Sequence, residues 1–255
     1  MQSSEGYSVL ITGGGSGLGR GLAEFMAAQG AKVTITGRRA DKLRDVADAI
    51  GPNCAIAPGD VSNEGDRQRM IDTAVAHGGG LDGLFNNAGN MLRGAITDLT
   101  ADNILDVMNI NVVAGMRLTG LAVPHMDRRG GGAVVFVGSG HTRRAFPGAS
   151  AYAASKGAVE VLTQVLAAEL GPKGIRVNCI VPGAVPTEIN VRAGVADSFD
   201  ANRARLESMV DDHPLGRIGT PLEIAEAVDY LLRAEWTTGA SVVVDGGLAL
   251  GVSYK

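Results

Sequence analysis

The sequence contains few side chains that bind metals or form cross-links. It has 2 cysteines and 4 histidines in 255 residues. Cys54 and Cys179 lie far apart and neither belongs to a CxxC or CxxH pattern, so a disulfide framework and a zinc knuckle are not indicated. The histidines form no HExxH motif or other ligand cluster. We therefore expect two buried thiols in a reducing compartment and no metal site.

The sequence also lacks an excess of positive charge and a long apolar run. Its 23 Lys and Arg residues against 27 Asp and Glu residues give a net charge of −4, the wrong sign for a protein that binds by neutralising nucleic-acid phosphates. The first basic residue is Arg20, so the start has no cationic signal-peptide region, and no apolar run approaches the ~18 residues of a membrane span. We expect a cytoplasmic protein that binds neither nucleic acid nor membranes.

The remaining composition is that of a globular protein with unusually many glycines. Hydrophobic residues make up 45% and charged residues 20%, which excludes a disordered or fibrous chain. Glycine, at 37 of 255 residues, is about twice as frequent as usual and shows no collagen-like period, so many backbone positions require its freedom or small size. Because no stretch resembles a flexible linker, we predict a single domain over residues 1–255.

Short apolar runs alternate with amphipathic helical stretches along the chain. The runs, each predicted to form a strand, are residues 8–12, 32–36, 53–57, 81–85, 133–137, 175–181 and 240–244. Between them apolar residues recur at the helical period, as at Leu43, Val46 and Ile50. Continuously apolar strands are buried on both faces, and the intervening helices permit parallel crossovers. The pattern predicts an α/β fold: a doubly wound, mostly parallel seven-stranded sheet with helices on both faces.

One long segment, from Pro182 to about Pro214, does not follow this alternation. It is polar and mixed in charge, and it has room for one or two short helices. Loops of such length in a compact domain are often functional. We predict that residues 184–213 form a lid over a substrate site.

A glycine-rich turn joins the first predicted strand to the helix after it. It reads Thr12-Gly13-Gly14-Gly15-Ser16-Gly17-Leu18-Gly19. Backbone N–H groups and the positive end of the helix dipole point into one crevice there, where a pyrophosphate would bind. Gly13, Gly17 and Gly19 do not match the usual GxGxxG register, and a turn of this kind can also serve tight packing alone.

The end of the second predicted strand carries arginines instead of an acid. Dinucleotide folds that use NAD place an acidic residue there to hold the ribose 2′-hydroxyl. Here Arg38 and Arg39 could bind a 2′-phosphate through bidentate, charge-assisted hydrogen bonds, so the sequence favours NADP(H). NAD(H) remains open, because Asp41 could reach a ribose if the turn bends back, and the arginines could instead be solvated.

Four polar residues form a candidate catalytic group. Tyr152 and Lys156 share one face of a predicted helix, about 6 Å apart, and an ammonium beside a phenol lowers the phenol pKa toward that of a general acid and base. Ser139 ends the run AVVFVGS that contains the fifth predicted strand, at the edge where open α/β sheets bind ligands. Asn111 is an amide in an apolar helical stretch, and either a structural backbone bond or a functional contact would satisfy it.

Taken together, these residues resemble the classical short-chain dehydrogenase/reductase family, and the resemblance spans essentially the whole chain. It rests on five groups of residues: the TGxxxGxG-like turn at 12–19, the adenine-side pair Asp60-Val61, the NNAG-like run Asn86-Asn87-Ala88-Gly89, the tetrad Asn111, Ser139, Tyr152 and Lys156, and Pro182-Gly183 with Thr187 on the nicotinamide side. Any one of these could be accidental, but all of them occur in order.

The resemblance implies a Rossmann-type sheet and hydride transfer between nicotinamide C4 and a carbonyl or secondary alcohol. In that scheme Tyr152 passes the proton, Lys156 lowers its pKa and holds the nicotinamide ribose, Ser139 orients the substrate oxygen, and Asn111 holds a water. The residues implied to bind the cofactor are Thr12, Gly13, Gly15, Ser16, Gly17, Leu18, Gly19, Arg38, Arg39, Asp60, Val61, Asn87, Ala88, Gly89, Tyr152, Lys156, Pro182, Gly183, Val185 and Thr187. NADP-preferring members often carry a basic residue at the position of Ser16, so the preference depends on Arg38.

The helix expected over residues 151–170 predicts self-association. Apolar residues such as Val159, Val161 and Val165 leave it almost no polar face, as a helix buried by a partner subunit requires. The resemblance implies a homotetramer, with a homodimer as the alternative.

Three functions fit these observations. The first is an NADP-dependent carbonyl reductase or secondary-alcohol dehydrogenase acting on a small molecule, or its NAD-dependent catabolic counterpart. The second is a 3-oxoacyl-[acyl-carrier-protein] reductase, with Arg128, Arg129 and Lys173 docking an acidic partner, although scattered basic residues are more often a solvated face. The third is a catalytically silent dinucleotide sensor, against which the intact tetrad argues.

Substrate contacts are expected from five places. These are Asn90, Met91, His141, the Arg143-Arg144 pair and the lid. The arginine pair could attract an anionic substrate, although solvent exposure is the simpler interpretation.

Overall fold

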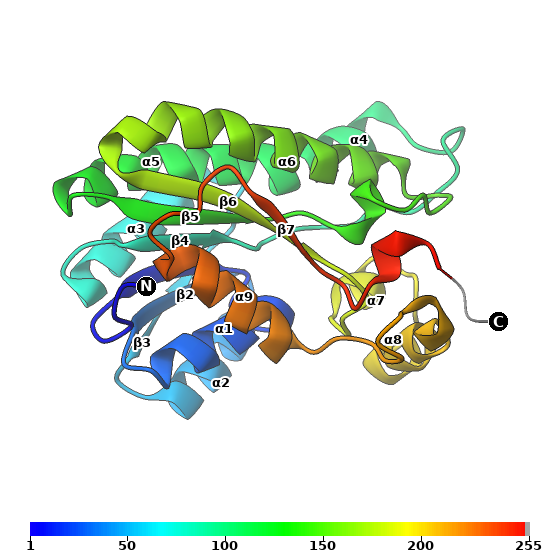
Figure 1. Cartoon of the computed structure of the whole chain (residues 1–255), viewed down its shortest axis with the longest axis horizontal. Coiled ribbons are helices and arrows are strands. Elements are labelled where there is room, and N and C mark those ends of the chain that lie inside the picture. The colour runs from blue at the N-terminus through cyan, green and yellow to red at the C-terminus, as the bar shows by residue number, and fades with distance from the viewer. Residues whose placement is uncertain (253–255) are drawn as a thin grey trace.

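Seven parallel strands form one sheet between two layers of helices (Figure 1). The computed structural model describes residues 1–252. The strands are β1 Ser8–Thr12, β2 Lys32–Gly37, β3 Cys54–Pro58, β4 Gly83–Asn86, β5 Gly132–Val137, β6 Ile175–Pro182 and β7 Ser241–Val244. Each lies within two residues of its predicted bounds, and the sheet is parallel throughout rather than mostly so.

The strand order β3-β2-β1-β4-β5-β6-β7 reverses direction between β1 and β4. Val9 pairs with Val33 of β2 on one side and with Gly83 of β4 on the other. In doubly wound sheets, ligands bind in the crevice beyond the carboxyl ends of the strands at such a reversal. Here the crevice lies between the residues that follow β1 and those that follow β4.

Helices cover both faces of the sheet because each has one apolar stripe. One face carries α1 Gly17–Ala27, α2 Ala40–Ile50 and α9 Pro221–Arg233, and Leu22, Met26 and Val228 are fully buried in its core. The other carries α3 Glu64–Gly78, α5 Ala114–Arg128 and α6 Ser150–Leu170, with Met70 and Leu118 in its core. The predicted doubly wound architecture is confirmed.

A continuous helix from Ala101 to Arg128 contains an irregular turn. It consists of α4 Ala101–Met108, a π-helical turn at Asn109–Val113, and α5. By length and composition alone this helix could cross a membrane. Its buried side chains, including Leu118 and Met126, belong to the core between the sheet and this layer of helices. Core helices of soluble proteins can also have the length and hydropathy of a membrane span.

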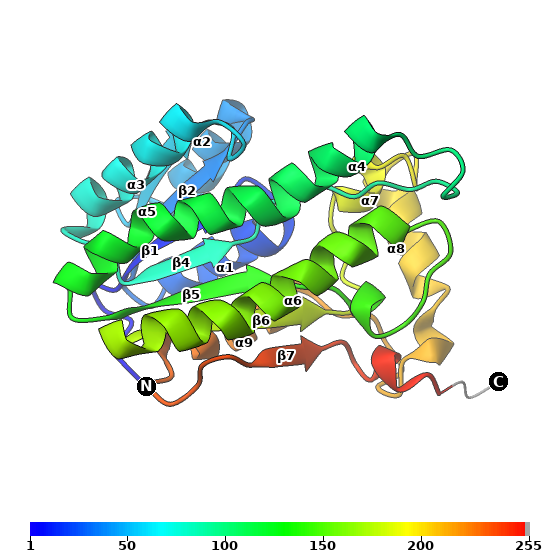
Figure 2. The same cartoon turned by 90° about the horizontal axis from the view of Figure 1, so that it is seen from above.

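The segment predicted to be a lid lies at the end to which the strands point (Figure 2). It contains α7 Ile189–Arg192, α8 Phe199–Glu207 and a 3₁₀ turn at Val210–Asp212, so the prediction of short helices is confirmed. The amide of Asn202, fully buried on α8, donates to the Thr187 carbonyl at 3.0 Å. Leu206 packs against Ala184 and Leu248, which fixes α8 to the body of the domain.

Both cysteines are free thiols. Cys179 is buried as expected, but Cys54, at the start of the edge strand β3, is only half-buried. Across residues 1–252, no three His, Cys, Asp or Glu side chains are grouped as a metal site requires.

Candidate active site

The glycine-rich turn forms a cradle open to the crevice. Gly13 (φ +68°) and Gly17 (φ +55°) adopt left-handed conformations that favour glycine. A Cβ at Gly19 would lie 2.5 Å from the Gly13 carbonyl oxygen, so the first turn of α1 requires a bare backbone there. Ser16 makes no side-chain cap, and the first turn of α1 contains no acidic residue. The N–H groups of this helix end can therefore bind an anionic group such as a pyrophosphate.

Thr12 and Asn87 join the ends of β1 and β4 behind this cradle. The Thr12 hydroxyl accepts hydrogen bonds from the N–H groups of Asn87 (2.9 Å) and Ala88 (2.8 Å) and donates to the Phe85 carbonyl (3.2 Å). The Asn87 amide donates to the Thr12 carbonyl at 2.8 Å. These bonds fix the two strand ends that form the crevice.

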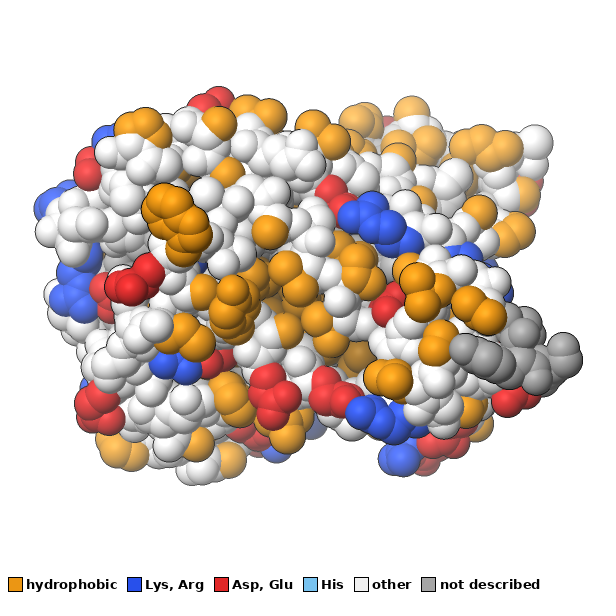
Figure 3. Space-filling view, in the orientation of Figure 1, with side chains coloured by type: hydrophobic (Ala, Val, Ile, Leu, Met, Phe, Trp, Pro, Cys, Tyr) orange, Lys and Arg blue, Asp and Glu red, His pale blue; other side chains and the backbone are white. Residues whose placement is uncertain are grey.

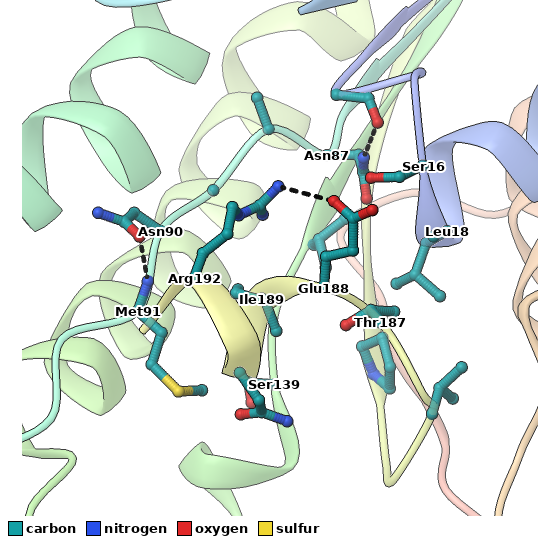
Figure 4. A pocket seen from close by; sticks show the side chains of 18 of the residues that line it. Ser16, Leu18, Asn87, Asn90, Met91, Ser139, Thr187, Glu188, Ile189 and Arg192 are labelled. Carbon is teal, nitrogen blue, oxygen red and sulfur yellow. Dashed lines mark hydrogen bonds and ion pairs between the residues drawn. The ribbon is translucent and has the colours of Figure 1, made fainter. Parts of the chain in front are cut away.

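A cavity of about 620 Å³ extends from the cradle to the lid (Figure 4). This volume suits a cofactor together with a small substrate. Of the residues predicted to act in catalysis or cofactor binding, all line this cavity except Thr12, Gly19 and Asn111. Those three lie behind the cavity wall, next to residues that line it: Thr12 beside Asn87, Gly19 beside Gly13 and Asn111 beside Asn90.

The arginines after β2 lie at one end of the cavity. Arg38 and Arg39 both line it, whereas Asp41, in the exposed first turn of α2, does not. Arg39 is not simply solvated: its guanidinium contacts Glu188 of the lid at 2.5 Å and the Ser16 hydroxyl at 3.3 Å. Glu188 also lies 4.0 Å from Arg192, so one carboxylate serves two guanidiniums at this end.

The candidate catalytic side chains meet farther along the cavity, where β5 ends against α6. Tyr152 and Lys156 lie on one face of α6, as predicted, with the Lys156 ammonium 5.6 Å from the centre of the Tyr152 ring. Lys156 donates to the Val137 carbonyl at 2.8 Å. The Ser139 hydroxyl lies 3.1 Å from Nδ1 of His141, whose ring meets the Tyr152 ring edge-on at 5.2 Å.

The pKa of Tyr152 departs from the expectation of a lowered value. Burial raises it, because a phenolate in this enclosed position loses hydration, and a hydrogen bond with Ser139 only partly offsets this effect. Burial lowers the pKa of Lys156 to about 8 for the same reason. The spacing of Tyr152 and Lys156 alone therefore does not predict the Tyr152 pKa, because burial disfavours both the phenolate and the ammonium.

Asn111 lies within the π-helical turn and its side-chain amide is fully engaged. Its Oδ1 accepts from the Asn90 N–H at 2.8 Å, and its Nδ2 donates to the Asn90 carbonyl and to the Ser155 hydroxyl, both at 2.9 Å. The backbone hydrogen bonds of the structural interpretation are therefore present. Asn111 fixes the loop after β4 against α6, and π-helical turns of this kind often occur at functional sites.

Several basic side chains have positions that the sequence did not predict. Arg143 is paired with Glu160, and Arg144 lies 3.3 Å from Asp212, so neither is a free cation for a substrate. Arg93, Arg192 and Arg205 line the cavity instead. On α8 a signal was present, because Asn202, Arg205 and Leu206 have the i, i+3, i+4 spacing of one helix face. No local pattern marks Arg93.

A family profile described as "Enoyl-(Acyl carrier protein) reductase" matches residues 13–249. The chain is 36% identical over 244 residues to a Streptomyces violaceoruber protein that bears the name of ketoacyl reductase 2 of the granaticin polyketide synthase, covering 94% of this chain and 95% of that one.

Two solved structures share the fold over nearly their whole length. One is the 3-ketoacyl-(acyl-carrier-protein) reductase from Brucella melitensis complexed with NADH, with a TM-score of 0.88, 31% identity and coverage of 97% of this chain and 100% of that one. The other is a short-chain type dehydrogenase/reductase from Mycobacterium ulcerans, with a TM-score of 0.88, 33% identity and coverage of 99% and 93%.

The fold, the glycine cradle and these similarities define a nicotinamide-dependent oxidoreductase that acts on CH–OH or C=O groups. The chain belongs to the short-chain dehydrogenase/reductase family.

Proposed function

We propose that the protein interconverts a small-molecule ketone and the corresponding secondary alcohol with NADP(H). The observation that carries the proposal is the meeting of Tyr152, Ser139 and Lys156 in the same cavity as the glycine cradle. A phenol hydroxyl, a hydroxyl at a strand end and a buried ammonium are the groups that proton transfer to a carbonyl oxygen requires.

Each of these residues has a distinct role in reduction. When bound, the nicotinamide supplies the hydride. The Tyr152 hydroxyl donates its proton to the substrate oxygen as negative charge develops there, and Ser139 donates a hydrogen bond to the same oxygen. Lys156, held on the Val137 carbonyl at 2.8 Å, provides the positive charge that favours the phenolate left behind. In oxidation the phenolate accepts the proton.

The test is nicotinamide turnover by Tyr152→Phe. This change removes the transferable proton and little else, so kcat should fall by about 10²- to 10⁴-fold while NADPH binding changes by less than about twofold. Tyr230→Phe is the matched control, because that hydroxyl lies on the surface and contacts Thr237 at 3.1 Å. Turnover of Tyr152→Phe close to wild type would overturn the mechanism.

The preference for NADP(H) is supported by charge at the adenosine end of the cavity. Arg38 and Arg39 line this end, and Asp41, the acid that could have bound a ribose, does not. Two guanidiniums suit a 2′-phosphate.

A second candidate, reduction of a 3-oxoacyl thioester on an acyl carrier protein, is suggested by two of the similar proteins, which are named as ketoacyl reductases. The proposed basic dock gives it little support. Arg129 is paired with Asp82 and Lys173 with Asp127, so two of its three positive charges are already neutralised on the surface. A thioester turned over no faster than a simple ketone would exclude this candidate.

We also propose that the protein assembles as a homotetramer, or a homodimer, in the cytoplasm. Val161 (62% exposed) and Val165 (48%) lie on the outer side of α6, and Met116 is exposed on the neighbouring helix α5. A second apolar surface, which includes Trp236, Tyr230 and Val243, lies over α9 and β7 (Figure 3). Two such surfaces on opposite layers suit two self-association contacts. Light scattering measures the assembly directly.

A further inference from the structure

The cavity is strongly basic, although the whole chain has a net charge of −4. Its charged lining residues are Arg38, Arg39, Lys42, Arg93, Lys156, Arg192 and Arg205 against Asp60 and Glu188. Arg38, Arg39 and Lys42 suit the phosphates of a dinucleotide, and Lys156 belongs to the catalytic group. Arg192 shares the carboxylate of Glu188 with Arg39. The other two cations, Arg93 and Arg205, have no role in the proposed function.

Arg93 and Arg205 lie at the substrate end, beside the catalytic group. Arg93 comes from the loop between β4 and α4, and Arg205 from α8 of the lid. Burial, together with the positive charges of Arg93 and Arg205, lowers the pKa of His141 to about 4. Partial burial and, after it, the charge of Arg93 lower the pKa of Arg205. His141 contacts both Ser139 and the Tyr152 ring, and Arg93 and Arg205 line the same cavity, so the two guanidiniums lie near the place where a substrate carbonyl would react.

Neither guanidinium is neutralised by a neighbouring carboxylate. Within the part of the chain that the structure describes, Arg93 forms no ion pair, and Arg205 only approaches the Asn202 amide oxygen at 3.5 Å. Other arginines nearby are paired: Arg143 with Glu160, and Arg203 with Glu207 on the outer side of α8. Because the charge of Arg93 acts on Arg205, an anion bound by both side chains would compensate their two positive charges.

The rest of this end of the cavity is apolar. Met91, Phe146, Leu206 and Met209 line it, and Phe146 lies 4.5 Å from the His141 ring. A substrate held here therefore needs an apolar body between its reacting carbon and its charged group. His141, neutral near pH 7, can donate or accept a hydrogen bond but supplies no counter-charge.

We infer that the substrate is a ketone or secondary alcohol whose apolar body ends in a carboxylate, and that Arg93 and Arg205 bind this carboxylate. The inference rests on the proposed function and adds the substrate class to it. Specificity is then set by the lid and the loop after β4, while Tyr152 and Ser139 act on any carbonyl presented to them.

The test compares oxo-carboxylates with their methyl esters as substrates of the full chain. Aryl and alkyl 4-oxo and 5-oxo acids provide such pairs, which differ mainly in charge. The wild type should show kcat/KM values about tenfold to a hundredfold higher for the acids, through a lower KM. Arg93→Gln and Arg205→Gln should each lose most of this preference and leave the ester values within about twofold. Arg203→Gln, the matched control on α8, should keep it.

Two results would overturn the inference: equal kcat/KM for acids and esters in the wild type, or equal losses on both in the two variants. Thermal unfolding of the NADPH complex, measured with rising concentrations of each acid or ester, provides a readout without turnover. The acid, but not the ester, should raise the unfolding temperature of the wild-type NADPH complex. Neither compound should raise that of Arg93→Gln or Arg205→Gln. A chain that binds the acid but turns over no carbonyl compound would refute the proposed function instead.

Discussion

The floor and the lid of the cavity are built in opposite ways. The floor consists of strand ends, the π-helical turn and the buried side of α6, where side chains such as Thr12, Asn111 and Lys156 form hydrogen bonds with the backbone. The lid presents exposed, charged side chains held by a few contacts, chiefly those of Asn202 and Leu206. Rigid floors suit a chemistry common to many substrates, and adaptable lids suit selection among them.

The largest effect should come from Gly19→Ala in the floor. The new methyl group would lie 2.5 Å from the Gly13 carbonyl, a backbone atom that cannot move without opening the cradle. NADPH affinity should fall by about a hundredfold, because a hydrogen bond from the cradle to a charged phosphate contributes about 1.5 to 3 kcal/mol. Gly120→Ala on α5 meets nothing within 4 Å and should bind NADPH normally. Fluorescence titration measures both, and unchanged affinity of Gly19→Ala would show that the floor is not rigid.

Arg38→Leu should separate the two cofactors. Loss of one guanidinium at a 2′-phosphate should weaken NADPH binding by about tenfold to a hundredfold and leave NADH binding unchanged. Arg44→Leu, on the exposed side of α2 and outside the cavity, is the control. If wild-type NADH binds as tightly as NADPH, Arg38 does not contact a phosphate and the protein is an NAD-dependent alcohol dehydrogenase.

The pH dependence of the reduction rate should show the effect of burial on Lys156, in the floor of the cavity. Since the pKa of Lys156 is lowered to about 8, its positive charge is present below that pH and is lost as the pH rises through it. The reduction rate at saturating cofactor should therefore fall about tenfold per pH unit above roughly 8. A decline beginning only near pH 10, the range of an ordinary lysine, would show that the ammonium is stabilised by something other than the groups described.

The smallest effect should come from Glu188→Gln in the lid. This change releases Arg39 from its carboxylate and removes a negative charge near the proposed 2′-phosphate position. Because Arg39 and Glu188 are partly exposed, at 45% and 32%, their interaction is screened by water, and NADPH binding should tighten only about two- to fivefold. Glu207→Gln, which affects an outward pair with Arg203, should have no effect. Weaker NADPH binding in Glu188→Gln would mean that the pair holds the lid in place.

The sequence was a good guide to the floor and a poor one to the substrate end of the cavity. Strands such as Ser8–Thr12 were predictable because burial on both faces requires an unbroken apolar run, and the ends of such strands place Thr12 and Ser139 at one edge. Arg93 and Arg205 meet only through the folding of two distant segments. Arg143 and Arg144 were misleading because their partners, Glu160 and Asp212, are far away in sequence. The pKa of Tyr152 depends on burial, which spacing does not reveal.

The π-helical turn at Asn109–Val113 has a consequence for how the chain tolerates change. It accommodates one more residue than a regular α-helical turn, so removing one residue there would rotate α4 by about 100° relative to α5. The hydrogen bonds between Asn111 and Asn90 would then be lost, and the apolar stripes of α4 and α5 would no longer face the same side. A one-residue deletion in a surface loop can be absorbed locally, whereas here it would separate the loop after β4 from α6. This helix therefore retains an inserted residue as part of its architecture.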